Sequence, residues 1–282
     1  MIATPMRHLF PLVLALLVAV PAAQAADTLP APAQTPPSSA NETADALAKA
    51  EQRGRAIFLH DLAAERATDA LVAQHRAFRK DKRVRGWITE EHDGRYRVSY
   101  IDAAPAVLYR VEVLPDGSID GPVEVLPVPA ALSPYEAGAA AARNLAMTAQ
   151  VASCAKSYNS VVLPGGDDRW TVYLLPGTTS PTAVPLGGSH RLEIAGGQIT
   201  ASRGFTRSCI QLNRAPSTHG AKVAAMMVTH MLDATPTEAH VYWSLWARTP
   251  MVVVTGEDAI WEIENGRIHR IETDADAPTA GS

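Results

Sequence analysis

Cysteine is scarce in this chain of 282 residues, which contains only Cys154 and Cys209. One pair in a chain of this length can staple a fold but cannot supply the framework of a disulfide-rich domain. No Cys-x-x-Cys motif is present, so nothing indicates a redox dithiol. The fold must therefore rest on hydrophobic cores, for which the composition, 47% hydrophobic and 19% charged, is ordinary.

The common catalytic signatures are also missing. The chain has no Gly-x-Ser-x-Gly elbow, no His-Glu-x-x-His helix, no Walker loop and no helix-loop-helix calcium loop. Residues 153–156, Ser-Cys-Ala-Lys, have the Ser-x-x-Lys spacing of penicillin-binding proteins. Those enzymes also need a Lys-Thr-Gly strand, and this chain has none. No motif therefore indicates an enzyme class.

Positive charge is not in excess. Lys and Arg number 25 against 29 Asp and Glu, for a formal net charge of −4, which argues against a nucleic-acid partner. Residues 76–85, Arg-Ala-Phe-Arg-Lys-Asp-Lys-Arg-Val-Arg, are the local exception. Cations near the carboxyl end of a helix complement its dipole, which favours a solvated helix terminus. The alternative is contact with an anionic surface such as lipid headgroups.

A long apolar run occurs at the amino terminus. Arg7 precedes an apolar stretch from Leu9 to Val20, and Ala23-Gln24-Ala25 forms a small-x-small cleavage site. These three parts define a signal peptide over residues 1–25, and the run is shorter than the roughly 20 residues that a transmembrane helix needs. We expect export to a bacterial periplasm or the exterior, with the mature chain starting near Ala26 and carrying no transmembrane span.

An exported chain meets an oxidising compartment. We therefore expect a disulfide between Cys154 and Cys209. Residues 26–41 contain four prolines and little that could form a core, which is typical of a disordered linker, and residues 273–282 predict a disordered tail.

Two segments predict helices. The proline-free, alanine-rich stretch 42–82 is the first, with Gly54 as a candidate break. The second covers 133–150, where Ser133 is followed by Pro134 and, at the third position, Glu136, the pattern of a capping box.

Most of the remaining chain predicts strands. Residues 87–126 alternate around Asp93-Gly94 and Asp116-Gly117, which favours a small antiparallel meander. After residue 160 the pattern predicts closely spaced antiparallel strands: 161–163, 170–175, 190–194, 198–202, 226–232, 240–247, 251–255, 259–264 and 267–271.

Residues 229–246 hold the richest cluster of chemistry-bearing side chains. We expect two strands joined by the loop 233–237, with His230 directly opposite His240. Cross-strand Cβ atoms lie roughly 5 Å apart, close enough for two imidazoles to bind one ion or share a proton. Alternation then places the candidate ligand-binding residues on one face of the second strand: Glu238, His240, Tyr242 and Trp246. The opposite, core face holds Ala239, Val241, Trp243 and Leu245.

Three interpretations of this face stay open. The histidines pack and are satisfied by backbone or Tyr hydroxyl groups, or they line a ligand pocket, or they bind a metal. In the last case His230, His240 and Glu238 are the zinc ligands, with His190 as a further candidate. The alanine-rich segment 219–231 could instead be helical, and His230 need not then face His240.

A short resemblance accompanies this cluster. The stretch from Val228 to Val254, with a histidine, then Pro-Thr-Glu-x-His-Val, then a strand, resembles a segment of exported proteobacterial proteins. The resemblance implies bacterial origin and a place outside the cytoplasm, and it carries no activity.

The sequence as a whole predicts an α+β fold. We expect a helical segment and meander over 42–130, and a mainly antiparallel β domain over 131–272 on which the helix 133–150 packs. The function we infer is a non-enzymatic periplasmic binding or envelope-interaction protein, whose partner is a small molecule or an envelope component. The alternative is a metal-assisted hydrolase that uses His230, His240 and Glu238.

Overall fold

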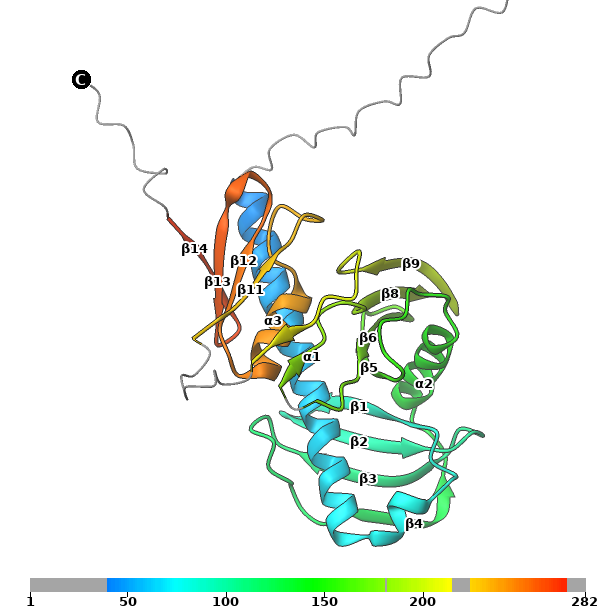
Figure 1. The fold of residues 1–282 in the computed structure, drawn as a ribbon. Coiled ribbons are helices and arrows are strands. Elements are labelled where there is room, and N and C mark those ends of the chain that lie inside the picture. Colours follow the sequence, from blue (N-terminus) through cyan, green and yellow to red (C-terminus); the bar gives the residue numbers. More distant parts are fainter. Residues whose placement is uncertain (1–39, 181, 215–223, 273–282) are drawn as a thin grey trace, which may run out of the picture. The chain divides into compact units, whose positions relative to one another are not determined.

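The computed structural model describes residues 40–180, 182–214 and 224–272 (Figure 1). The predicted signal peptide, nearly all of the predicted linker and the predicted tail lie outside these residues, as do residues 219–223. The described chain has an α+β fold with mainly antiparallel sheets, as the sequence predicts. None of the described helices is both long and apolar enough to cross a membrane.

The first helix, α1 (Ala40–Gln74), is continuous, so the candidate break at Gly54 is wrong. Gly54 instead marks the point where α1 crosses another helix, α3 (Glu238–Ala247). A Cβ atom on Gly54 would lie 2.4 Å from Cβ of Val241, so only glycine allows the two backbones to approach this closely. A short 3-10 helix, η1 (Arg76–Lys80), completes the predicted helical segment.

The predicted meander forms the first sheet, in the order β1-β2-β3-β4. Its strands are β1 (Gly86–His92), β2 (Arg95–Ile101), β3 (Val107–Val113) and β4 (Glu124–Ala130). Asp93 and Gly94 have φ angles of 47° and 75°, the left-handed values that a two-residue hairpin turn requires. β4 is an edge strand, and its residues Pro127 and Pro129 cannot donate hydrogen bonds to a further strand.

Helix α2 (Pro134–Met147) begins with the predicted capping box. Ser133 Oγ accepts from the backbone N–H of Glu136 at 3.1 Å, and the Glu136 carboxylate accepts from the backbone N–H of Ser133 at 2.8 Å. The same carboxylate accepts from Ser99 and Arg110, which ties the start of the helix to the meander. Its alanines pack in a core shared with the first sheet and the sheet that follows.

The second sheet is antiparallel in the order β5-β6-β8-β9. Its strands are β5 (Tyr158–Pro164), β6 (Arg169–Pro176), β8 (His190–Ala195) and β9 (Gln198–Gly204). Two short strands, β7 (Ala183–Val184) and β10 (Leu212–Asn213), pair beside it. The predicted disulfide between Cys154 and Cys209 is present, with a Cα–Cα distance of 5.3 Å, and it joins the segment after α2 to the loop between β9 and β10.

The last sheet has the order β11-β12-β13-β14. Its elements are β11 (Met226–Thr229), β12 (Met251–Val254), η2 (Gly256–Asp258), β13 (Ile260–Glu264) and β14 (Arg267–Ile271). Within the segment 219–231, residues 226–229 are therefore strand. β11 and β12 pair in parallel, which needs a crossover connection, and α3 supplies it. The strand predicted over 240–247 is thus wrong.

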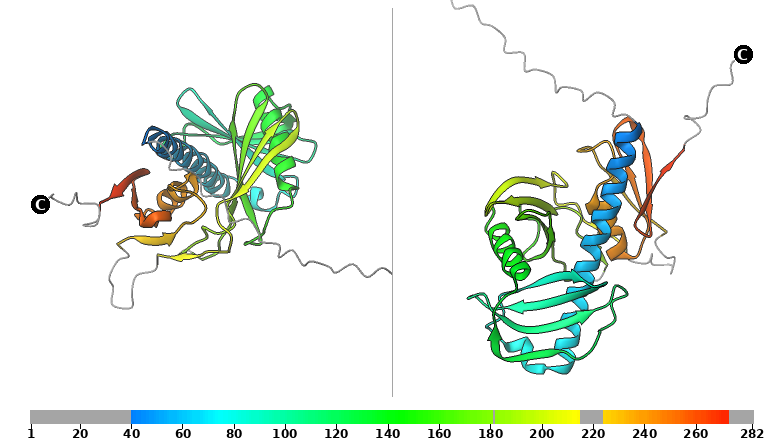
Figure 2. Two further views of the ribbon diagram at one scale, coloured as in Figure 1. Left: turned by 90° about the horizontal axis from the view of Figure 1, so that it is seen from above. Right: turned by 180° about the vertical axis from the view of Figure 1, so that it is seen from behind.

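Helix α1 takes part in two hydrophobic cores, beside the β11–β14 sheet and beside the β1–β4 sheet (Figure 2). Ala50 and Ile57 pack in the first core with α3, and Ala63, Ala67 and Leu71 pack in the second with strands of the meander. Successive turns of one helix thereby pack against both the first and the last sheet. The surface where α1 meets α3 carries the candidate site.

Candidate functional site

The two histidines singled out from the sequence do meet. His230 follows β11 and His240 lies in the first turn of α3. Their ring centroids are 4.6 Å apart with an interplanar angle of 77°. The proximity is therefore present, although the predicted cross-strand register is wrong because residues 238–247 are helical. For the same reason, Glu238, His240, Tyr242 and Trp246 do not share one face of a strand.

Hydrogen bonding fixes the tautomer of His240. The backbone N–H of Thr237 donates to Nδ1 of His240 at 3.0 Å, so the proton of the neutral ring lies on Nε2. Burial, together with the neighbouring His230, lowers the pKa of His240 to about 3, which keeps the ring neutral. Its Nε2 has no hydrogen-bond partner among the described residues, and such a buried donor costs about 1–3 kcal/mol.

This arrangement does not assemble the predicted zinc site. A protonated Nε2 on His240 has no free lone pair for a metal ion. Glu238 Oε1 accepts from Arg191 Nη1 at 2.5 Å and from the Tyr173 hydroxyl at 3.2 Å. The further candidate, His190, donates from Nε2 to the carbonyl of Ala152 at 2.8 Å. In the described part of the chain, no group of three or more His, Cys, Asp or Glu side chains could hold a metal ion.

His230 instead belongs to a chain of charge-assisted hydrogen bonds. It donates from Nε2 to Oδ2 of Asp233 at 2.8 Å, and Arg203 donates to both carboxylate oxygens of Asp233 at 2.7 and 3.2 Å. Burial acts to raise the pKa of Asp233, but these donors bring it well below its usual range. Asp233 therefore stays ionised and ties the loop after β11 to β9.

The cavity beside the two histidines is small. Its volume is about 160 Å³, and His230, His240, Phe205 and Leu232 are among its lining residues. Sites for small molecules usually have roughly 300–1,000 Å³. This cavity is too small for such a ligand.

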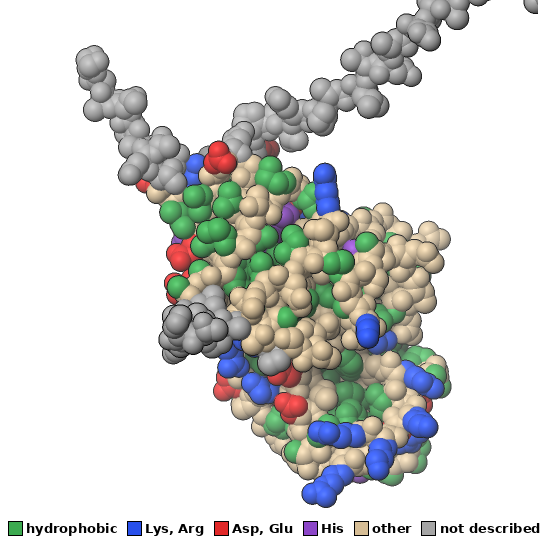
Figure 3. All heavy atoms as spheres, in the orientation of Figure 1, with side chains coloured by type: hydrophobic (Ala, Val, Ile, Leu, Met, Phe, Trp, Pro, Cys, Tyr) green, Lys and Arg blue, Asp and Glu red, His purple; other side chains and the backbone are tan. Residues whose placement is uncertain are grey.

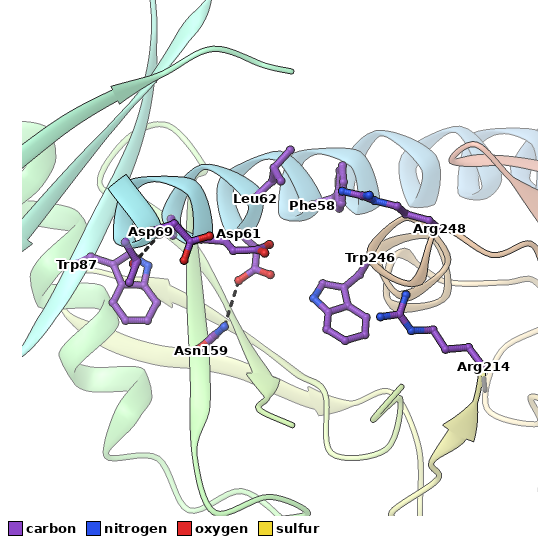
Figure 4. Close-up of a pocket in the computed structure, with 12 residues that line it drawn as sticks. Phe58, Asp61, Leu62, Asp69, Trp87, Asn159, Arg214, Trp246 and Arg248 are labelled. Carbon is purple, nitrogen blue, oxygen red and sulfur yellow. Dashed lines mark hydrogen bonds between the residues drawn. The ribbon is translucent and has the colours of Figure 1, made fainter. Parts of the chain in front are cut away.

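A larger cavity, of about 520 Å³, lies where α1 passes the carboxyl end of α3 (Figure 4). We call it the α1–α3 cleft. The aromatic part of its wall is formed by Phe58, Trp87 and Trp246. Asn159, on β5 of the second sheet, also lines it. Its volume falls within the usual range for small-molecule sites.

A buried carboxyl group lies in the wall of the cleft. The Tyr242 hydroxyl donates to Oδ2 of Asp61 at 2.8 Å, and Nδ2 of Asn159 donates to Oδ1 at 3.3 Å. Burial raises the pKa of Asp61 to about 6, against the lowering effect of these two donors. Asp61 is thus held in one orientation and is largely ionised at neutral pH.

Acidic and basic side chains lie on opposite sides of the α1–α3 cleft (Figure 4). Glu65 and Asp69 follow Asp61 at intervals of four residues, so all three lie along one face of α1. Arg214 and Arg248 line the cleft on the side of Trp246. The Arg214 guanidinium lies 5.3 Å from the centroid of the Trp246 ring. The cleft therefore has an acidic wall and a basic wall with an indole beside the basic one.

A second cavity, of about 370 Å³, adjoins the first. Asn159 and Trp246 line both, and Tyr242 lines the second while its hydroxyl holds Asp61 in the first. Lys156 and Thr178 are among the polar residues of the second cavity. Because the two cavities share these walls, an elongated ligand could extend from one cavity into the other.

The residues predicted for a ligand face are thus distributed over three places. Trp246 lines both cavities of the cleft, and Tyr242 lines the second. His240 borders the small cavity, while Glu238 is held by Arg191 and Tyr173. Sequence reasoning missed Asp61, Asn159 and both arginines of the cleft. The regular spacing of acids at 61, 65 and 69 is the one signal that could have suggested an acidic surface.

Comparison of the chain with protein-family models, with curated proteins and with solved structures found no match.

Proposed function

We propose that this protein is an exported, non-enzymatic binding protein whose α1–α3 cleft takes a small zwitterionic molecule of the amino-acid or short-peptide class. The observation that carries the proposal is the acidic wall of Asp61, Glu65 and Asp69 facing Arg214 and Arg248 across the cavity (Figure 4). An ammonium group is attracted to the first wall. A carboxylate accepts hydrogen bonds from the guanidinium groups of the second.

The chemistry of the cleft favours binding over catalysis. The described residues that line the larger cavity include no histidine, cysteine or serine, so carboxyl groups are the groups there that could transfer a proton. Both oxygens of Asp61 already accept hydrogen bonds from Tyr242 and Asn159, which hold the carboxylate in place before a ligand arrives. Such preorganisation lowers the entropy cost of binding.

Ligand binding in the cleft is expected to show as thermal stabilisation. A free amino acid or dipeptide at about 100 times its Kd raises the stability by about 2.7 kcal/mol. That corresponds to an increase of several degrees in Tm, since about 1 kcal/mol shifts Tm by about 2–4 °C for a chain of this size. A panel of the free amino acids and dipeptides, with uncharged sugars for comparison, is measured by differential scanning fluorimetry.

Two tryptophan variants give this experiment its control. Trp246→Ala removes a wall of the cleft and should abolish the ligand-induced increase in Tm. Trp170→Ala, which removes an indole packed on Tyr135 in another core, should lower Tm yet keep the increase. The proposal is wrong if no zwitterion stabilises the protein, if sugars stabilise it equally, or if Trp246→Ala responds like the unaltered protein.

Export is the second part of the proposal. The disulfide is compatible with an oxidising compartment. Together with the signal-peptide pattern of residues 1–25, it favours a bacterial periplasm or the exterior. Mass spectrometry of the exported protein is expected to find Ala26 as its first residue, because Ala23-Gln24-Ala25 follows the apolar run at the distance that signal peptidase uses. Exported protein that retains Met1 would contradict it.

A further inference from the structure

A second surface, formed by η1, the residues that follow it and the edge strand β4, combines positive charge with exposed apolar groups. Six side chains in and after η1 are exposed: Arg76, Arg79, Lys80, Lys82, Arg83 and Arg85. We call them the η1 basic cluster. Figure 3 shows Lys and Arg side chains gathered on the lower part of the molecule, where Figure 1 places η1 and β4. The last turn of α1 contains no basic residue, and all six cations follow that helix, so the dipole of α1 does not account for the cluster.

The charge of the cluster is only slightly neutralised by its own neighbours. Asp81, the one acid within residues 76–85, accepts from Arg83 at 2.7 Å and from the Tyr109 hydroxyl at 2.7 Å. These donors hold the pKa of Asp81 well below its usual range, so it stays a fixed anion. β4 adds one acid, Glu124, at its first position. Four positive charges therefore remain after Asp81 and Glu124 are counted against the six.

Two valine side chains of the edge strand β4 are exposed. Val125 is 43% exposed and Val128 is 75% exposed. A cavity of about 470 Å³ is lined by Lys80 and Arg83 together with Val125, Leu126 and Pro127. Cations and apolar groups thus border the same hollow.

We propose that the η1 basic cluster and the exposed valines of β4 dock this protein on a bilayer of anionic phospholipid. The cations meet the phosphate groups, while the exposed valines add apolar contact at the boundary between headgroups and acyl chains, since binding strength grows with buried apolar area and with attraction to anionic lipids.

Two other partners fit the surface less well. Pro127 and Pro129 lack backbone N–H groups, so β4 is a poor template for the addition of a strand from another protein. Val125 and Val128 match nothing on a nucleic-acid backbone, whose recognition uses cations and hydrogen-bond donors. The net charge of the whole chain is negative, so attachment must be local to this surface.

The test is co-sedimentation of the exported protein with phospholipid vesicles. Vesicles that contain phosphatidylglycerol are expected to bind the protein, and binding should weaken as salt is raised because it is electrostatic. Vesicles of phosphatidylcholine alone should not bind. The triple variant Arg79→Gln, Lys80→Gln and Lys82→Gln should reduce partitioning by on the order of 100-fold, since each cation near an anionic surface contributes about 1 kcal/mol, or about a factor of five.

Two further variants keep the result interpretable. Lys49→Gln, Arg169→Gln and Arg207→Gln change three exposed cations elsewhere on the chain and should leave vesicle binding unchanged. Val125→Ser with Val128→Ser should weaken binding while the charge stays the same. The proposal is overturned if phosphatidylglycerol vesicles do not bind, if the two triple variants lose binding equally, or if the valine variant binds like the unaltered protein. Far-UV circular dichroism checks that each variant is folded, and none of the substitutions lies in the α1–α3 cleft.

Discussion

Trp243→Ala is expected to lower the free energy of unfolding by about 3–5 kcal/mol, the usual range for removing a buried aromatic side chain. Trp243 is 2% exposed in the core between α1, α3 and the β11–β14 sheet. Its ring makes edge-to-face contacts with Tyr242 and Trp246, at centroid distances of 4.7 and 5.3 Å. Its Nε1 donates a hydrogen bond to Ser189 Oγ at 2.9 Å. Alanine leaves a cavity and an unpaired hydroxyl in its place.

Urea denaturation of the purified protein measures this loss. Met231→Ala is the control, because Met231 is 71% exposed and its removal should change stability by no more than about 0.5 kcal/mol. A Trp243→Ala protein as stable as the Met231→Ala protein would mean that the described packing of α3 is incorrect.

Removal of the disulfide is the other large effect that we expect. Cys154 and Cys209 are 55 residues apart, and closing a loop of that length restricts the unfolded chain by about 4 kcal/mol on the loop-entropy model. The double variant Cys154→Ser, Cys209→Ser should therefore unfold at a markedly lower urea concentration than the oxidised protein. A reducing agent should lower the stability of the unaltered protein to the same level and leave the double variant unaffected. Equal stability of the oxidised protein and the double variant would contradict this account.

Elements with strong local signals could be predicted from the sequence. Ser133 and Glu136 satisfy backbone groups of their own helix, so the start of α2 is visible in four residues. Asn265 and Gly266 adopt φ angles of 50° and 73°, which their residue types tolerate, and the hairpin between β13 and β14 follows from that turn. In each case neighbours in the sequence determine the conformation.

Helix α3 could not be recognised in this way, because it is buried on nearly all sides. Val241, Tyr242, Trp243 and Ser244 are consecutive and all buried, so no polar face reveals a helical period. A short apolar run reads equally well as a strand. Thr237, directly before Glu238, is a helix-start signal, but the run of apolar residues that follows favours a strand more strongly. The role of Gly54 is equally hidden from the sequence, since it depends on close contact with Val241, which is distant in the chain.

The candidate site was even less accessible to sequence reasoning. Asp61, Asn159 and Trp246 come from α1, β5 and α3, and only the packing of these elements brings them to one cleft. The sequence predicts the proximity of His230 and His240 correctly but for the wrong reason. The loop between the two histidines folds back on itself, which brings them together although residues 238–247 form a helix and not a strand. Their hydrogen bonds, which disfavour a metal, depend on Thr237 and Asp233 in the folded chain.

The pH dependence of ligand affinity tests the cleft most directly. Isothermal titration calorimetry of the most stabilising amino acid or dipeptide is compared between the unaltered protein and Asp61→Asn. The pKa of Asp61 is raised to about 6, so its charge is present above that pH and lost below it. We expect the affinity of the unaltered protein to be highest above pH 6 and to fall as the pH drops through that value. The Asp61→Asn protein should bind more weakly and without this dependence. Equal affinity of the two proteins at neutral pH would contradict the assignment of the cleft as a zwitterion-binding site.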